Sequence, residues 1–112
     1  MNDVLQQLAT TLAARRHADP LQSYVASLHR KGLNKILEKV GEEATEVILA
    51  AKDAAAGGDR AAVIGEVADL WFHSMVMLSH LDLDIADVMQ CLSDRAGVSG
   101  LDEKAARDTP GK

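Results

Sequence analysis

The sequence predicts an all-α protein, and three observations support this fold class. Hydrophobic residues make up 47% of the 112 positions, whereas aromatic residues make up only 3%, and the chain contains 2 prolines. Alanine and leucine are abundant, and both favour helices over strands. Apolar residues also recur every three or four positions, which places them on one face of a helix. We therefore expect four to five helices that form a bundle.

The N-terminal part predicts a packing helix followed by a short second helix. Asn2 or Asp3 can cap the first helix. Pro20 breaks it, and residues 23–28 form a short helix that ends near Gly32.

The stretch 33–56 predicts the central helix of the fold. Asn34 is placed to cap it, and the turn at Gly57 and Gly58 ends it. Gly41 lies in its interior, where glycine costs about 0.5 to 1 kcal/mol relative to alanine. This indicates the close approach of a ligand or a neighbouring backbone, with simple tolerance of the glycine as the alternative. One face of this helix is apolar and consists of Leu33, Ile36, Leu37, Val40, Ala44, Val47, Ile48 and Ala51.

Two further helices follow the glycine turn. Asp59 caps the first, and its segment 67–78 is apolar on nearly every side. Such a helix is buried on several sides, which a small monomer can barely arrange, so we expect dimerisation to complete the bundle. Asp82 or Asp84 begins the last helix, and Gly97 ends it.

Composition also limits the function. The net charge of −5 argues against a nucleic-acid partner, because such proteins usually carry a basic field. The single cysteine, Cys91, allows no internal disulfide and fits a reducing cytoplasm. No long uncharged apolar run or signal peptide is apparent, so we expect a cytoplasmic protein without a membrane partner.

Helical winding places acidic residues beside the apolar face of both long helices. Glu42, Glu43 and Glu46 lie on the first of these strips, and Glu66 and Asp69 on the second. Because a short turn makes the two helices antiparallel neighbours, the carboxylates of Glu43, Glu46, Glu66 and Asp69 can converge. Partly buried anions require cations, and ligation by oxygen alone suits Mg²⁺ or Mn²⁺.

Basic residues precede this acidic strip. Lys35 and Lys39 lie one and two turns upstream, and Lys31 comes before them. These ammonium groups can hold phosphate oxygens that the metal does not reach. Taken singly, each lysine can be explained as part of a surface ion pair with a nearby acid, which contributes little to stability. Together with the acids and the interior glycine, they favour a metal and polyphosphate site.

These residues carry a resemblance to a known family. The pattern EExxE at 42–46, followed by ExxD at 66–69, resembles the signature of the all-α NTP pyrophosphohydrolase superfamily, which includes the MazG-like and dimeric dUTPase enzymes. A wider match across residues 23–107 resembles the phosphoribosyl-ATP pyrophosphatase family, and it rests on KGLNKILEKVGEEATEVILAAK, GEVADLWFHSMVML and SGLDEKAAR. The lysine-rich context before the acidic motif makes this match specific.

The resemblance implies Mg²⁺-dependent hydrolysis of phosphoribosyl-ATP to phosphoribosyl-AMP and pyrophosphate, the second step of histidine biosynthesis, by a cytoplasmic homodimer. Mn²⁺ is a possible substitute ion. A separate cyclohydrolase then performs the next step, since this chain is too short to include one. The implied metal ligands are Glu43, Glu46, Glu66 and Asp69, with Glu42 a further ligand or the group that orients water, and the implied phosphate-binding residues are Lys31, Lys35 and Lys39.

The domain organisation follows from the same match. Residues 1–96 form the pyrophosphohydrolase domain, and residues 97–112 form a polar tail. The family motif within that tail implies that it is partly ordered by docking over a neighbour or the substrate. We expect His73 to be a hydrogen-bonding residue at the edge of the core rather than a metal ligand.

Two alternative functions remain open. A house-cleaning nucleoside triphosphate pyrophosphatase would use the same carboxylates on other nucleotides. A non-catalytic helical dimerisation or adaptor protein would carry the acidic strips only as solvated faces.

Overall fold

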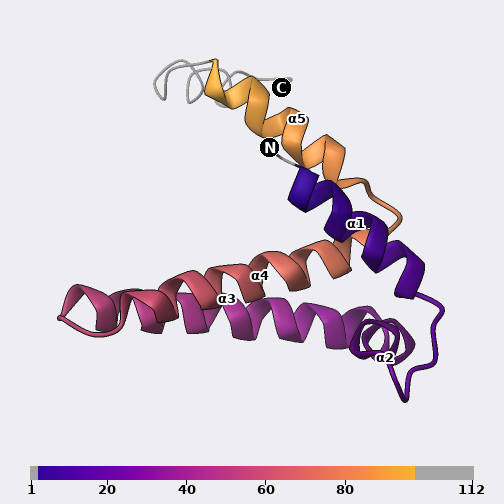
Figure 1. Ribbon diagram of the computed structural model, residues 1–112, viewed down its shortest axis with the longest axis horizontal. Helices are drawn as coiled ribbons and strands as arrows, with labels where there is room; N and C mark the ends of the chain where they lie inside the picture. Colours follow the sequence, from indigo (N-terminus) through magenta and orange to yellow (C-terminus); the bar gives the residue numbers. More distant parts are fainter. Residues whose placement is uncertain (1–2, 98–112) are drawn as a thin grey trace, which may run out of the picture.

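The computed structural model describes residues 3–97, which form helices and no strand (Figure 1). The all-α prediction is therefore confirmed, at the upper end of the expected number of helices. The predicted docking of the tail concerns residues 98–112, outside the described part. The 5 helices are α1 (Asp3–Arg15), α2 (Tyr24–Lys31), α3 (Leu33–Ala55), α4 (Arg60–His80) and α5 (Ile85–Ala96).

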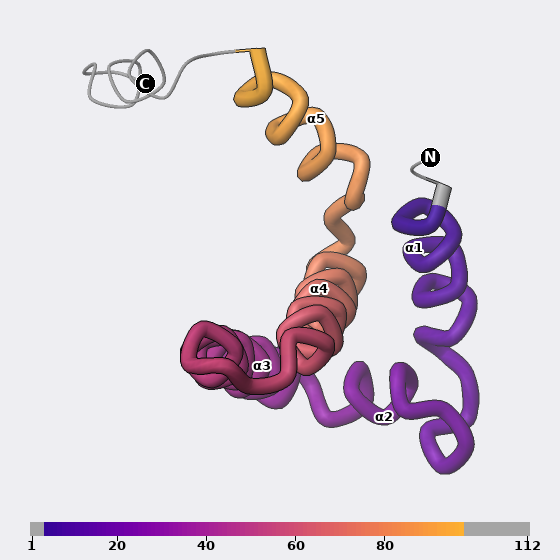
Figure 2. The backbone as a smooth tube through the Cα atoms, turned by 60° about the vertical axis from the view of Figure 1, so that its left-hand side comes forward, coloured from indigo at the N-terminus to yellow at the C-terminus, as the bar shows by residue number. Residues whose placement is uncertain are grey.

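Helices α3 and α4 form an antiparallel hairpin, and both views show them side by side (Figures 1 and 2). Gly57 makes the reversal possible because its φ of 102° lies in the left-handed region that glycine adopts without strain. Asp59 then caps α4 by accepting a hydrogen bond of 2.9 Å from the backbone N–H of Ala61. The hairpin predicted from the glycine turn and this cap is confirmed.

The other three helices gather at one end of the hairpin. Helix α2 joins the start of α3, while α1 and α5 project from the hairpin at the end where α4 finishes (Figure 2). Ser23 caps α2, and Asp84 caps α5. The prediction that Asn34 caps α3 is wrong: the helix already begins at Leu33, and Gly32, with a φ of 100°, occupies the capping position without a side-chain bond.

The hydrophobic core lies where α1, α2, α3 and α4 meet, and the hairpin extends away from it. Ile36 is fully buried there, but Leu37 and Ile48, on the predicted apolar face of α3, are 43% and 61% exposed. On α4, Trp71 is 57% exposed. The single chain thus covers only one end of its apolar surface. The buried core residues are Leu12, Val25, Leu28, Ile36, Met75 and Val76.

Gly41 differs from the expectation of a close neighbour. Apart from its own helix, none of the described residues lies within 4 Å of a Cβ atom built at this position, so no other described segment approaches it. Its carbonyl oxygen accepts a hydrogen bond of 3.1 Å from the hydroxyl of Thr45. Among the residues that the structure describes, the prediction that a neighbouring backbone approaches Gly41 is therefore wrong.

Helix α4 is the one described helix that is long and apolar enough to span a membrane by length and composition. It also carries Glu66 and Asp69, and it packs along α3. Charged side chains in the middle of an apolar helix typically face a protein neighbour or a polar site, which is the arrangement found here.

Candidate functional site

The helix hairpin brings carboxylates from both acidic strips together. Glu43 of α3 and Glu66 and Asp69 of α4 each offer a carboxylate oxygen, and these oxygens lie within 4.8 Å of one another. Glu43 and Glu66 are partly buried, whereas Asp69 is exposed. The predicted convergence of the two strips is therefore present for these residues.

The pKa of Glu66 responds to the close approach of these carboxylates. Partial burial raises the pKa of Glu66, and the negative charges of Asp69, Glu46 and Glu43 raise it further. Glu46 itself is exposed and lies outside the closest cluster, but its charge acts on Glu66. A cation in this position would relieve the repulsion that the clustered carboxylates exert on one another.

Glu42 and Glu43 are adjacent in sequence but have different surroundings. The side chain of Glu43 is 13% exposed, whereas that of Glu42 is 50% exposed. Helical winding produces this difference, because consecutive residues are about 100° apart around the axis. Glu42 accepts a hydrogen bond of 3.1 Å from Lys39 and does not belong to the group formed with Glu66 and Asp69.

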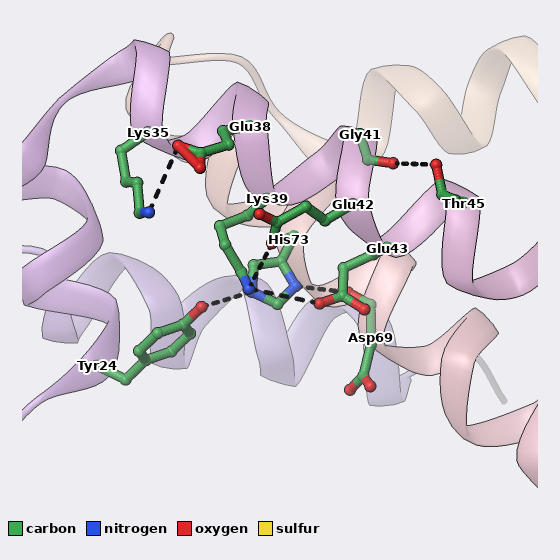
Figure 3. Close-up of polar contacts among 10 residues, drawn as sticks. All are labelled: Tyr24, Lys35, Glu38, Lys39, Gly41, Glu42, Glu43, Thr45, Asp69 and His73. Atoms are coloured by element: carbon green, nitrogen blue, oxygen red, sulfur yellow. Dashed lines mark hydrogen bonds and ion pairs between the residues drawn. The ribbon is translucent and has the colours of Figure 1, made fainter.

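Lys39 is the lysine that pairs with Glu42 and Glu43 (Figure 3). Its Nζ atom lies 3.1 Å from Glu42 Oε2 and 3.7 Å from Glu43 Oε1. The hydrogen bond that Lys39 donates to Glu42 is the main factor that raises the pKa of Lys39, with smaller contributions from Tyr24 and Glu43. Lys39 thus remains an ammonium group beside the carboxylates, where it can also contact a bound anion.

The other two predicted phosphate-binding lysines lie elsewhere. Lys35 pairs with Glu38 at 3.4 Å on the exposed side of α3. Lys31 is exposed at the end of α2. The described residues therefore bring one of the three lysines directly to the acidic cluster.

Two aromatic residues complete the site, and the sequence indicated only one of them. The hydroxyl of Tyr24 lies 2.8 Å from Nε2 of His73, and Nδ1 of His73 lies 2.8 Å from the backbone oxygen of Asp69 (Figure 3). His73 is 6% exposed, so the prediction that it is a hydrogen-bonding residue at the core edge is confirmed. Sequence reasoning missed Tyr24, because it begins a short helix 49 residues before its partner.

The donor set suits a hard divalent cation. Carboxylate oxygens from Glu43, Glu66 and Asp69 are the ligands that Mg²⁺ and Mn²⁺ prefer. An ammonium group at the edge of the same cluster is suited to the oxygens of a phosphate chain. Fold and site together define an all-α protein with a candidate cation and phosphate site across a helix hairpin.

Comparison with known proteins narrows this class to one family. The family model described as phosphoribosyl-ATP pyrophosphohydrolase matches residues 5–96. Proteins named phosphoribosyl-ATP pyrophosphatase from Burkholderia cenocepacia and Burkholderia vietnamiensis are each 56% identical over 105 residues, which covers 94% of this chain and 87% of theirs. The chain belongs to the phosphoribosyl-ATP pyrophosphohydrolase family.

Proposed function

We propose that this chain hydrolyses phosphoribosyl-ATP at its α–β anhydride and releases pyrophosphate and phosphoribosyl-AMP, the second step of histidine biosynthesis. One observation carries this proposal: relatives that share 56% of residues over 94% of the chain bear the name of that activity. The carboxylate cluster on α3 and α4 supports it, because the cluster could hold a divalent cation, and hydrolysis of a phosphoanhydride requires positive charge that stabilises the phosphate oxygens.

The acidic residues would hold Mg²⁺. Glu43, Glu66 and Asp69 form the cluster that supports this role, and Glu46 stands close enough to act on the charge of Glu66. Bound Mg²⁺ would offset phosphate charge and make an attacking water more acidic. Mn²⁺ has the same preference for oxygen and can serve in its place.

Other side chains would act on the substrate itself. Lys39 would contact a phosphate oxygen, since its ammonium group lies at the edge of the acidic cluster. Glu42, which is more exposed than Glu43, would orient the water or bind a further ion. Lys31 and Lys35 would meet parts of the substrate that extend beyond the cluster, such as the ribose phosphate.

The working unit would be a cytoplasmic homodimer in which the partner chain completes the site. Trp71 and Leu92 line an apolar groove of about 500 Å³ between α4 and α5, and both are more than half exposed. Ile48 and Ile64 leave further apolar surface on the hairpin. Exposed apolar area of this extent favours association with a second copy. A separate cyclohydrolase would use the product.

Substrate profiling tests this proposal against its alternatives. Purified chain with Mg²⁺ should release pyrophosphate from phosphoribosyl-ATP far faster than from dUTP or dCTP. A preference for dUTP or dCTP would favour the house-cleaning pyrophosphatase. Absence of pyrophosphate release from all three, in a folded helical protein, would favour the adaptor protein.

A further inference from the structure

A second polar cavity lies apart from the acidic cluster, where the loop after α1 and the last turn of α2 meet the end of α4. Its volume is about 420 Å³, within the range of about 300 to 1,000 Å³ that is typical of small-molecule sites. None of the described residues that line it carries a carboxylate, whereas five of them are basic. These are Arg16, His17, His29, Arg30 and His80.

The cavity is separate from the proposed metal site. His80 lies about three turns beyond Asp69 on α4, which corresponds to about 16 Å along the helix axis. Neither Asp69 nor the other residues of the acidic cluster line the cavity. A ligand in the cavity would therefore meet basic groups and not the carboxylates of α3 and α4.

The positive charge around the cavity is not balanced within it. Burial lowers the pKa of His29, and the nearby charges that lower it further, those of Arg16, His80 and His17, are all positive. Asp82 pairs with Arg16 at 2.8 Å but does not line the cavity. The cavity is thus a positively charged region on a chain with a net charge of −5.

Capping of helix ends explains only part of this basic group. Cations are favourable at helix C-termini, and Arg16 donates hydrogen bonds of 2.7 and 3.4 Å to the carbonyl oxygens of Ser79 and His80 at the end of α4. Within residues 3–97, however, the side chains of His17 and Arg30 form no hydrogen bond or ion pair, and both are exposed. These two residues line the cavity without a partner of their own.

The histidine pair adds a neutral donor. The Nδ1 atoms of His29 and His80 are 2.9 Å apart, so one of them donates to the other. Nε2 of His29 is buried and has no hydrogen-bond partner among the described residues. A buried N–H without an acceptor is rare, so the proton of neutral His29 belongs on Nδ1, and Nδ1 of His80 accepts it. Neutral His80 then carries its own proton on Nε2, which leaves it one N–H to donate.

We propose that this cavity binds a phosphate dianion, either free or as the end group of a small phosphate monoester. Arg16, Arg30 and His17 supply positive charge, and His80 supplies a further N–H. Arg16 has five N–H groups, and its bonds to Ser79, His80 and Asp82 use three of them.

The chemistry of the donors favours phosphate over other anions. Guanidinium groups match the paired oxygens of a phosphate, and donors that come from the α1–α2 loop, α2 and α4 suit a tetrahedral group better than a planar carboxylate. The net negative charge of the chain opposes a long polyanion, so the ligand is a single small anion.

Histidine NMR with inorganic phosphate tests the proposal directly. The titration is made at constant pH with a chelator present, so that no divalent cation can carry phosphate to the acidic cluster. The imidazole resonances of His17, His29 and His80 should shift and saturate. His73, which is bonded to Tyr24 and to the backbone of Asp69, is the internal control and should not shift.

Two arginine variants show whether the cavity holds the phosphate. Arg30→Gln removes an exposed cation that lines the cavity, so calorimetry should show phosphate affinity about 3- to 10-fold lower, as expected for loss of one hydrogen bond to a charged group. Arg15→Gln is the matched control, because it removes the same charge from an exposed residue that does not line the cavity. Its affinity should stay within about twofold of the original chain.

A parallel titration with ribose 5-phosphate identifies the source of the phosphate group. Tighter binding than inorganic phosphate would indicate a phosphate monoester, and weaker binding would indicate free phosphate. The proposal fails if the three histidines do not respond to either compound, or if Arg30→Gln and Arg15→Gln bind phosphate equally well. A shift at His73 alone would place the anion at the acidic cluster and would also refute the proposal. None of these measurements needs Mg²⁺ or turnover, so their result is independent of whether the chain hydrolyses phosphoribosyl-ATP.

Discussion

Glu43 on α3 and Asp69 on α4 place carboxylate oxygens within 4.8 Å of each other across the helix hairpin. The two residues are 26 positions apart in sequence, since 69 − 43 = 26. Their repulsion opposes the contact between helices unless a cation offsets it. Activity and stability should therefore respond together to the metal.

Removing one carboxylate should stop the reaction and leave the fold intact. Asp69→Asn and Glu43→Gln should each reduce pyrophosphate release by more than about 100-fold, because loss of a direct ligand should exceed the 10- to 100-fold cost typical of residues behind the ligands. Far-ultraviolet circular dichroism should remain helical. Glu38→Gln, which changes an exposed acid of the same helix, provides the control. Activity equal to the control would contradict the assigned site.

Metal should stabilise the folded chain measurably. Mg²⁺ at 100 times its dissociation constant should add about 2.7 kcal/mol to the free energy of unfolding if, as proposed, it binds only the assembled carboxylates. Thermal unfolding with Mg²⁺ and with a chelator checks this. In Glu66→Gln the difference in transition temperature between Mg²⁺ and chelator should be much smaller than in the original chain. A transition temperature of the original chain that does not change with Mg²⁺ would contradict the proposed metal site.

The lysines should differ in their effect on the substrate. Lys39→Met should lower kcat/KM about tenfold or more, because a charge-assisted contact to phosphate is lost beside the acidic cluster. Lys35→Met should have a smaller effect, since Lys35 pairs with exposed Glu38. Steady-state kinetics of the two variants provide the comparison. Equal losses would show that the substrate extends along α3 over both positions.

Acid should destabilise the protein through His29. Burial lowers the pKa of His29 below its ordinary 6.5, and the positive charges of Arg16, His80 and His17 lower it further. Between the folded-state pKa and about 6.5, the unfolded chain therefore binds more protons than the folded chain. The free energy of unfolding decreases as the pH is lowered through that window, and it levels off at lower pH. Full stability from this group is present above about pH 6.5.

Urea unfolding at about pH 7.5 and about pH 5.5 measures this effect. Carboxylates also titrate towards acid, so His29→Gln, which cannot gain a proton, is the reference. The original chain should lose more stability between the two pH values than the variant does. The Nδ1 atoms of His29 and His80 lie 2.9 Å apart, so protonation of both rings would place two charges in contact. Parallel losses in the two proteins would contradict this assignment.

The exposed apolar surface should mediate self-association. Trp71→Glu places a charge in the groove between α4 and α5, so a dimer that uses this surface should dissociate. Sedimentation velocity reports the change. Leu21→Glu is the control, because Leu21 is 93% exposed and does not line this groove. If Trp71→Glu still forms dimers, the interface lies on another surface.

Much of the fold could be read from local patterns. Ser23, Asp59 and Asp84 cap the helices that they were expected to begin, since capping depends on a side chain and the next few backbone N–H groups. Asn34 failed as a cap because the left-handed backbone at Gly32 lets α3 start earlier. The apolar periodicity of α3 predicted a buried face. Neighbouring helices cover only part of that face, so Ile48 remains exposed in the single chain.

Local patterns along the chain were enough to predict helices and two strips of carboxylates beside an apolar face, because helical winding sets which residues share a side. The packing of the helices was needed to show that Glu43, Glu66 and Asp69 meet, that Lys39 is the lysine beside them, and that Tyr24 reaches His73. Periodicity acts over one or two turns of a single helix. Contacts between helices depend on how they pack and rotate against each other, which a local pattern does not encode.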